Sequence, residues 1–426
     1  MAFILNFNVF YFPFLEFSIC FFLYLDIQYM CFQRKKCKCE IFLEIEKRIL
    51  MRNGMMSREE KVFVTQPLLS DVMDVFSEIK DIWESKWLTN MGQKHDEFEN
   101  KLKDVLKVQN VSLFNNGTIA LLVAIKALDL PNGSEVITTP FTFAATPHCI
   151  SWNGLKPIFC DIEPNTMTID ADKIEKLITP NTAAILGVHV YGFPCNVEKI
   201  DAIAKKHNLK VIYDAAHAFS TEINGKGIGT YGDITMFSFH ATKLFNSIEG
   251  GCLTYNNPDL VRKIYNLRNF GIRSEELVEE VGINGKMNEI QAAIGLLNLN
   301  LYKQEQEKRA KIKAFYDSKL GNIKGIKIPQ MPDNATYSYQ YYPIIIDNDY
   351  PLSRNEVYEK FKEINIFTRK YFYPACHDYE CYKSDLTVKL ADLSVVDDLK
   401  HKVLCLPFYG DLTKEVLERI IRGFYA

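Results

Sequence analysis

Short apolar runs alternate with amphipathic segments through most of the chain, and this alternation limits the possible folds more than any other feature of the sequence. The runs AAILGVHVYG (183–192) and LKVIYDAAHA (209–218) are typical of buried strands. Between them, NVEKIDAIAKKHN (196–208) has the spacing of an amphipathic helix. Such strand–helix–strand units predict an α/β protein with a mostly parallel sheet between helices.

The pattern of apolar and charged residues changes near residue 301. A long charged helix is predicted over 301–320, followed by a strand over 337–347 and a helix over 352–364 that Ser353 would cap. A chain of 426 residues, 47% of them hydrophobic, is long enough for two domains. We therefore predict a large domain over residues 56–300 and a smaller C-terminal α+β domain over 301–426.

Residues 1–55 differ from the rest of the chain. The first 33 are crowded with Phe, Tyr and Ile, and the basic residues 34–36 that follow resemble the cytoplasmic flank of a membrane anchor. Glu16, Asp26 and Pro13 argue against a span, and neither a basic start nor a small-residue cleavage site marks a secretory signal. We favour translated upstream sequence ahead of a start near Met51, Met55 or Met56 and expect no membrane attachment.

Charge and cysteine usage exclude some classes of partner. Lys and Arg number 50 and Asp and Glu 53, and they are interspersed, so no basic surface for nucleic acid is expected. The 11 cysteines include no C-x-x-C pair. We expect them to be reduced, as in the cytoplasm, and we expect no metal site, because no second ligand pair follows Cys37 and Cys39.

Two polar side chains follow neighbouring apolar strands. Asp214 follows KVIY, and Lys243 ends the stretch ITMFSFHATK, with Ser238 five residues before it. Open α/β sheets bind their ligands at the carboxyl ends of the strands, so a carboxylate and an amine are expected in one crevice. Alternatively, Asp214 is only a helix cap and Lys243 only a surface charge.

Two further segments lead from a strand into a helix. In VSLFNNGTIALLVAIKALDL, the strand breaks before Gly117, and a helix opens at Thr118 with free backbone N–H groups that suit a phosphate. In EVITTPFTFAATPHCISWNG, Phe143 lies at the mouth of the helix, as a ligand platform or as part of the core. An amine, a carboxylate, a phosphate cup and an aromatic ring are together what pyridoxal phosphate requires.

At these positions the sequence resembles the DegT/DnrJ/EryC1/StrS family of sugar aminotransferases, which have the aspartate aminotransferase fold (type I) and use pyridoxal phosphate. The resemblance runs from about residue 60 to the end. It is carried, in the family's order and spacing, by FNNGTIAL (114–121), PFTFAAT (140–146), YDAAHAF (213–219), FSFHATK (237–243), EGG (249–251) and NGKMNEIQAAIGLLNL (284–299).

The resemblance implies roles for the residues around the cofactor. Lys243 would form the Schiff base and move the substrate proton, and Asp214 would hold the proton on the pyridine nitrogen. His217 matches the residue beside the ring, although it could equally be a packed helix residue. Phe143 would stack on the ring, and the phosphate cup would consist of Gly117, Thr118 and Ser238.

The resemblance also implies a homodimer with shared active sites. Asn284 matches an asparagine that the family contributes from the neighbouring subunit. The family usually has an arginine near this asparagine, whereas this chain has Gly285, Lys286 and Met287.

The resemblance also implies a substrate class within the family. VTQPLL (64–69), the segment 82–102 and RKYFYPACHDYECY (369–382) resemble members that aminate C4 of a nucleotide-linked 4-keto-6-deoxyhexose. These members commonly take thymidine diphosphate sugars and use glutamate as the amino donor, for amino sugar or surface polysaccharide synthesis. The candidate substrate residues are Trp87, Asn90, Tyr371 and His377, and ordinary packing is an equally good reading of each.

Three alternatives remain at this point. Related dehydratases carry a histidine in place of the Schiff-base lysine, and Lys243 argues against that activity. Amination at C3 needs the same cofactor chemistry, so the cofactor motifs do not separate it from amination at C4. A sensor or scaffold, including one attached to a membrane through residues 1–33, would keep the fold without catalysis.

Overall fold

The computed structural model of the chain describes residues 60–385 and 392–425. The predictions for residues 1–55, including the one that concerns Cys37 and Cys39, therefore lie outside the described residues. Within these two ranges, no helix combines the length and the apolar character that a membrane crossing requires.

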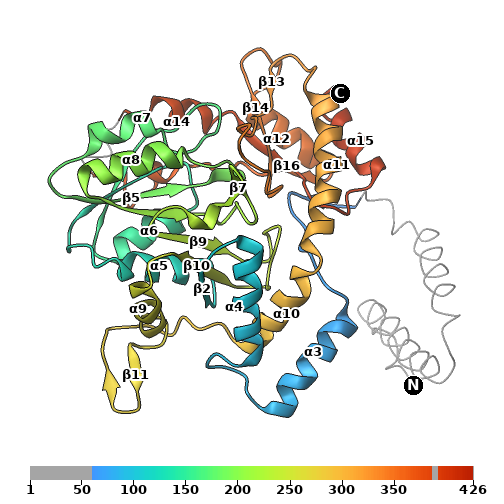
Figure 1. Cartoon of the computed structure of the whole chain (residues 1–426). Coiled ribbons are helices and arrows are strands. Elements are labelled where there is room, and N and C mark those ends of the chain that lie inside the picture. The colour runs from blue at the N-terminus through green and yellow to red at the C-terminus, as the bar shows by residue number, and fades with distance from the viewer. Residues whose placement is uncertain (1–59, 386–391, 426) are drawn as a thin grey trace, which may run out of the picture. The chain divides into compact units, whose positions relative to one another are not determined.

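A seven-stranded sheet forms the centre of the protein (Figure 1). Its strands are parallel except for β10, which runs antiparallel to both of its neighbours, β9 and β2. This arrangement confirms the prediction of an α/β protein with a mostly parallel sheet. From one edge to the other, the strands are β2 (Asn110–Phe114), β10 (Gly251–Tyr255), β9 (Ile234–Ser238), β6 (Lys210–Asp214), β5 (Thr182–Val188), β3 (Glu135–Thr138) and β4 (Lys156–Phe159).

Helices cover both faces of this sheet, as the side-chain alternation of a fully buried strand requires. Leu186 and Ile212 pack into one core with α5 (Gly117–Ala127) and α6 (Ala145–Trp152). Their neighbours Ile185 and Val211 point to the opposite core. The helices of that second core are α4 (Gln93–Leu106), α8 (Val197–His207) and α10 (Glu289–Leu299).

The C-terminal part has a hydrophobic core of its own. Helix α11 (Tyr302–Leu320) leads into a sheet of β13 (Ile326–Lys327), β14 (Tyr342–Ile346) and β16 (Val403–Leu406). Ser353 caps α12 (Arg354–Glu363) in a capping box, and α15 (Lys414–Arg422) completes this part. Of the strand predicted over 337–347, only the second half is β14; residues 337–341 form no helix or strand.

The remaining elements connect or extend these parts. Strand β1 (Val62–Phe63) pairs with β15 (Ile366–Phe367), so the first described residues join the C-terminal core. A two-stranded hairpin projects at the lower left of Figure 1, between α9 and α10. The other elements are α3 (Val72–Ser85), α7 (Ala171–Ile174), β7 (Glu222–Ile223), β8 (Lys226–Gly227), α9 (Asp259–Leu267), β11 (Ile272–Ser274), β12 (Leu277–Val278) and α14 (Ser394–Leu399).

Candidate active site

Three of the predicted residues lie at the carboxyl ends of strands that run in the same direction, β6 and β9 side by side and β2 beyond the antiparallel β10. Asp214 is the last residue of β6 and Ser238 the last residue of β9, and Gly117 follows the end of β2. Because these strands run in the same direction, their carboxyl ends meet at one edge of the sheet, where such sheets bind ligands. The fold therefore brings the carboxylate, the serine and the glycine turn to one edge of the sheet.

Asp214 is a buried carboxyl group, 5% exposed, with two hydrogen-bond donors. The Thr146 hydroxyl donates to its Oδ2 at 2.9 Å, and the Ala216 backbone N–H donates to its Oδ1 at 3.0 Å. Burial raises the pKa of Asp214, while these two donors and the nearby Lys243 oppose that rise. A cation placed against this carboxyl would therefore be bound strongly.

Lys243 lies on a closed loop between β9 and β10, which we call the lysine loop (residues 239–250). Backbone hydrogen bonds close the loop, from Phe239 N–H to the Gly250 carbonyl at 2.8 Å and from Ser247 N–H to the Phe239 carbonyl at 3.0 Å. Burial lowers the pKa of Lys243 to about 8, although Asp214 acts in the opposite direction. Among residues 60–385 and 392–425, none forms a hydrogen bond or ion pair with its Nζ.

The glycine turn is packed too closely to accept a side chain. A β carbon added to Gly117 would lie 3.0 Å from Ser238 Cβ, and one added to Gly251 would lie 2.8 Å from Gly117 Cα. Helix α5 begins at Gly117, and its N-cap Asn116 accepts a hydrogen bond from Ile119 N–H at 2.8 Å. The exposed Thr118 lies in the first turn, whose other N–H groups suit a phosphate.

His217 is held in a stack of aromatic rings. Its Nδ1 accepts a hydrogen bond from the Tyr191 backbone N–H at 3.1 Å, so the proton of a neutral ring lies on Nε2. The ring stacks on Phe372 with centroids 6.0 Å apart, and the edge of Tyr341 meets it at 5.0 Å. Burial lowers the pKa of His217 well below its usual value, and Lys243 lowers it further. This residue is thus a neutral ring in an irregular segment, not part of a helix.

Phe143 lies just before α6 and is 61% exposed. Its neighbour Thr142 is buried and forms a hydrogen bond of 2.9 Å with the hydroxyl of Thr146. Phe143 is therefore adjacent in the chain to the hydroxyl pair that leads to Asp214. Its open ring face is available to a flat ligand.

Asn284 is exposed and lies between α9 and α10. It forms a β-bridge with Asn269, and its carbonyl accepts a hydrogen bond from Asn115 Nδ2 at 3.5 Å. Lys286 Nζ donates to Asn269 Oδ1 at 2.7 Å. The segment thus runs beside the end of β2, and Asn284 itself is exposed.

The four candidate substrate residues do not form one cluster. Trp87, 56% exposed, and Asn90 lie in the loop between α3 and α4. The Tyr371 ring packs against the Tyr341 ring with centroids 5.3 Å apart, and Tyr341 connects Tyr371 to the stack around His217. The His377 side chain is engaged elsewhere: its Nε2 lies 3.0 Å from Asp397 Oδ1, within an ion-pair cluster that includes Lys400 and Asp378.

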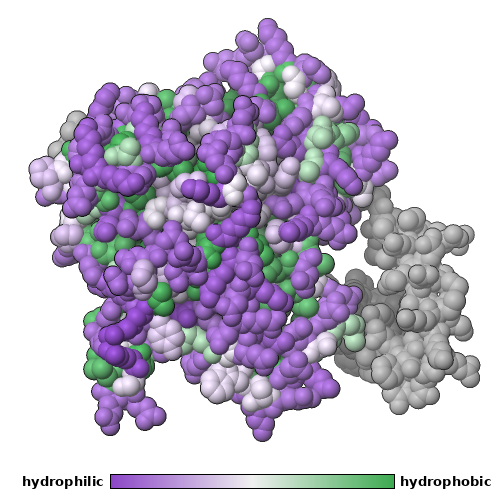
Figure 2. All heavy atoms as spheres, in the orientation of Figure 1, coloured by the Kyte–Doolittle hydropathy of each residue, from purple (hydrophilic) through white to green (hydrophobic). Residues whose placement is uncertain are grey.

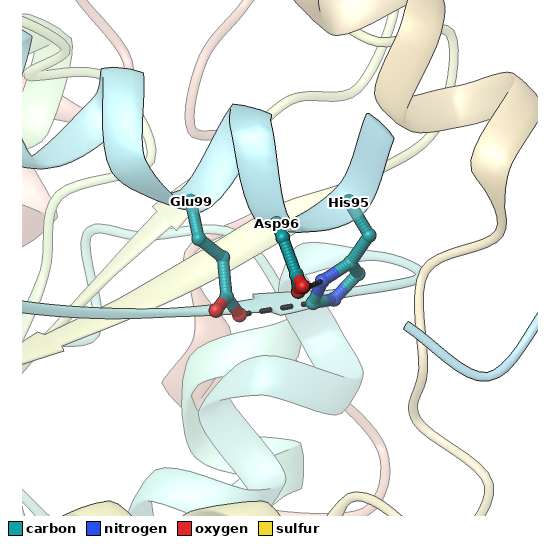
Figure 3. Close-up of side chains that lie close together, drawn as sticks. All are labelled: His95, Asp96 and Glu99. Atoms are coloured by element: carbon teal, nitrogen blue, oxygen red, sulfur yellow. Dashed lines mark ion pairs between the residues drawn. The ribbon is translucent and has the colours of Figure 1, made fainter. Parts of the chain in front are cut away.

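Three side chains of α4 lie close enough to share a cation: His95, Asp96 and Glu99 (Figure 3). Both ring nitrogens of His95 face carboxylates, at 3.5 Å from Asp96 and 3.7 Å from Glu99. However, Glu99 already binds the buried Arg268 at 2.7 Å and the Leu113 N–H at 2.9 Å. We interpret the group as surroundings of the Glu99–Arg268 ion pair, which fastens α4 to the central sheet.

Two residues at the site escaped the sequence analysis. Thr146 lies in the motif PFTFAAT. It follows Thr142 by four residues where a helix begins, and this spacing is the signal that could have revealed the hydroxyl pair. Gln340 contacts the lysine loop from a segment 98 residues away in the chain, and no local pattern marks such a contact.

Comparison with known proteins agrees with this geometry. The profile of the DegT/DnrJ/EryC1/StrS aminotransferase family matches residues 71–424. A dTDP-4-amino-4,6-dideoxy-D-glucose transaminase of Shigella dysenteriae is 43% identical, over 85% of this chain and 98% of its own length. A GDP-perosamine synthase of Caulobacter vibrioides is 32% identical, over 80% of this chain and 92% of its own length. The crystal structure of DesI with its TDP-sugar product superposes with a TM-score of 0.81, at 32% identity, covering 86% of this chain and 92% of DesI.

The residues at this edge of the sheet fit the cofactor that this family uses, pyridoxal phosphate. Lys243 offers an amine without a partner among the described residues, Asp214 a buried carboxyl, and the turn at Gly117 a cradle that a β carbon would fill. The match to the family profile spans both the strand-end residues and the C-terminal part. The chain therefore belongs to the DegT/DnrJ/EryC1/StrS aminotransferase family.

Proposed function

We propose that this enzyme transfers an amino group from glutamate to C4 of a nucleotide-linked 4-keto-6-deoxyhexose, of the dTDP-4-dehydro-6-deoxyglucose type. In this exchange glutamate becomes 2-oxoglutarate and the keto sugar becomes a 4-amino sugar. The observation that carries the proposal is the match, over 98% of their length, to two dTDP-4-amino-4,6-dideoxy-D-glucose transaminases at 43% identity. The amino sugar would serve polysaccharide synthesis, such as that of an O-antigen. A relative named as a spore coat polysaccharide biosynthesis protein supports this role.

Lys243 is the residue on which catalysis would depend. Bound pyridoxal phosphate supplies an electron sink for the carbon that gives up its proton. The lowered pKa of Lys243, about 8, leaves a usable fraction of neutral amine near neutral pH. That amine can act as a nucleophile and then hold the proton that moves between substrate and cofactor atoms.

Asp214 and its donors would hold a proton at the ring nitrogen. A buried carboxylate bound by Thr146 and by the Ala216 N–H is fixed in position and has few other cations near it. It therefore favours a protonated, positively charged partner. The turn at Gly117, with Thr118 and Ser238, would bind the phosphate, and Phe143 would cover the ring.

We propose a homodimer in which Asn284 serves the partner's cofactor site. Two apolar surfaces support an interface between copies. One is the hairpin next to Asn284, where Figure 2 shows hydrophobic side chains at the lower left; its exposed residues are Ile272, Leu277, Val278 and Val281. The other follows α3, where the exposed residues recur at helical spacing: Leu69, Val72, Phe76 and Trp83. Such patches mark protein–protein contacts.

We also propose that the enzyme works in the cytoplasm. The seven cysteines among the described residues are free, and six of them are buried. Free, buried cysteines are typical of proteins in a reducing compartment.

The proposed reaction is tested with the purified protein, glutamate and a panel of keto sugars. The panel comprises dTDP-, UDP- and GDP-linked 4-keto-6-deoxyhexoses and a dTDP-linked 3-keto-6-deoxyhexose. We expect the highest kcat/KM with the dTDP-linked 4-keto sugar, and the position of the amine in the product is read by NMR. A product aminated at C3, or no product from any sugar of the panel, contradicts the proposal.

A further inference from the structure

A buried amide, Gln340, holds the part of the lysine loop around Lys243 from outside, while Asn298 and Gln291 hold Asn246 and Glu249 further along the loop. Gln340 Nε2 donates a hydrogen bond to the Thr242 carbonyl at 3.0 Å, and Gln340 Oε1 accepts one from the Leu244 N–H at 2.6 Å. The two partners are the residues on either side of Lys243. Because one is a backbone acceptor and the other a backbone donor, they fix which end of the amide is oxygen and which is nitrogen.

Gln340 itself has little freedom to move. It is 2% exposed, and its backbone carbonyl and that of Tyr339 lie 3.5 and 3.1 Å from Nη1 of Arg309. Arg309 is fully buried and donates from Nε to Glu305 at 2.6 Å. Glu305 in turn accepts a hydrogen bond from the Gly410 N–H at 2.8 Å. A chain of charge-assisted contacts thus anchors Gln340 to α11 and the C-terminal core.

The residues beside Gln340 reach other parts of the same site. The Tyr341 ring packs edge-to-face with the His217 ring, with centroids 5.0 Å apart. On the other side, Ser338 packs against Gly192. A β carbon added to Gly192 would lie 2.0 Å from the Ser338 Oγ. Gly192 has a φ of +94°, which a residue with a side chain rarely adopts. Segment 338–341 therefore touches the lysine loop, the histidine stack and the turn after β5.

From these contacts we infer that Gln340 is a positioning residue that sets the direction in which Lys243 leaves the backbone. A side chain is aimed by the backbone dihedrals of its own residue, and the two hydrogen bonds of Gln340 restrain the peptide groups on both sides of Lys243. Misplacement of a reacting group by about 1 Å can cost on the order of 100-fold in rate. Both hydrogen bonds of Gln340 to the lysine loop are with backbone groups, so it acts on the loop through the direction of Lys243.

The test compares two variants of Gln340 with a matched control in the full chain, saturated with pyridoxal phosphate. Gln340→Met keeps the length of the side chain and removes both hydrogen bonds. Gln340→Glu keeps the acceptor for Leu244 N–H and removes the donor to Thr242. The control is Asn153→Leu, which removes an amide at the end of α6 that donates at 3.2 and 2.9 Å to the Leu122 and Cys149 carbonyls and forms no hydrogen bond with the lysine loop.

The decisive readouts are kinetics and amide hydrogen exchange. For Gln340→Met we expect kcat to fall at least tenfold with KM for the keto sugar within about threefold. We expect faster exchange in peptides covering residues 239–250, with exchange in β5 and β6 unchanged. For Gln340→Glu, both kcat and the exchange rate of residues 239–250 should lie between those of Gln340→Met and those of the unaltered protein. Asn153→Leu should leave both quantities unchanged.

The inference is overturned if Gln340→Met keeps kcat within twofold, or if exchange rises equally throughout the sheet. If Gln340→Met does not fold, Gln340→Glu is judged by the same two criteria. Hydrogen exchange needs no substrate, so it remains decisive even if the proposed sugar proves wrong.

Discussion

The hydroxyl of Thr146, in the first turn of α6, donates a hydrogen bond of 2.9 Å to the carboxyl of Asp214 at the end of β6. Thr146 is fully buried, and its oxygen also bonds to Thr142 at 2.9 Å. The hydroxyl therefore helps to keep Asp214 ionised in a buried position, against the rise in pKa that burial causes. This contact joins two separate segments of the site.

Replacing Thr146 by Val should weaken catalysis without disrupting the fold. The carboxyl of Asp214 would lose one donor, which raises its pKa and typically costs about 1–3 kcal/mol for a buried acceptor. We expect kcat/KM to fall by roughly tenfold, measured in steady-state assays. Thr254→Val is the control, since it removes a buried hydroxyl that donates to the Gly229 carbonyl at 2.8 Å. Equal losses of kcat/KM in the two variants would contradict the role of Thr146.

Lys243→Ala should abolish turnover and leave the protein folded. The variant should still bind pyridoxal phosphate, because the turn at Gly117 and the carboxyl of Asp214 do not depend on the amine. Borohydride should fix the cofactor to the unaltered chain at Lys243 and not to the variant, as read by mass spectrometry. A Lys243→Ala variant with full activity would refute the assignment.

The reactivity of Lys243 should depend on pH in a way that reveals Asp214. With a pKa of about 8, the amine in protein freed of cofactor should be half-maximally reactive near pH 8, well below an ordinary lysine. Asp214 raises the pKa of Lys243, so Asp214→Asn should move the midpoint to lower pH. Acylation of the Lys243 peptide at a series of pH values, followed by mass spectrometry, measures the midpoint. A shift to higher pH would show that the two groups are not coupled as described.

Gly251→Ala should weaken cofactor binding. The new methyl group would lie 2.8 Å from both Gly117 Cα and the Phe237 carbonyl oxygen, so the turn at Gly117 would have to move. Overpacking of this kind typically costs about 1–3 kcal/mol. We expect a higher Kd for pyridoxal phosphate, by fluorescence titration. Gly321→Ala, at the end of α11, serves as the comparison, because its new methyl group would have one close contact, 2.9 Å from the Asp317 carbonyl oxygen. This variant should leave the Kd for pyridoxal phosphate unchanged.

Shared sites predict that two inactive variants can complement each other. In a mixed dimer of Lys243→Ala and Asn284→Ala subunits, one site would contain the unaltered Lys243 of one chain and the unaltered Asn284 of the other. Co-expressed subunits with different tags, purified through both tags, should therefore recover up to about half of the activity per dimer. Activity equal to the mean of the two parent dimers would place Asn284 outside the partner's site.

The parts of the site that follow strands could be predicted from the sequence, because an apolar run fixes where a strand ends. Asp214, Ser238 and Gly117 were located in this way, and the parallel sheet brings their ends together. Contacts between distant segments could not be predicted, because hydrogen-bond partners of a loop depend on tertiary packing. Gln340 illustrates this: it lies in a stretch expected to be a strand, yet residues 337–341 leave the strand geometry to reach the lysine loop.

The distance along the chain between Gln340 and the residues it holds has a consequence for how the enzyme is made. Thr242 precedes Gln340 by 98 residues, and a ribosome adds roughly 5–20 residues per second, so about 5–20 s separate the synthesis of the two. During that interval the nascent chain already contains Lys243, Asp214 and Gly117, but the peptide groups on either side of the lysine lack their hydrogen-bond partner on Gln340. A chain released before residue 340 would therefore carry the reactive lysine without the two hydrogen bonds that aim it.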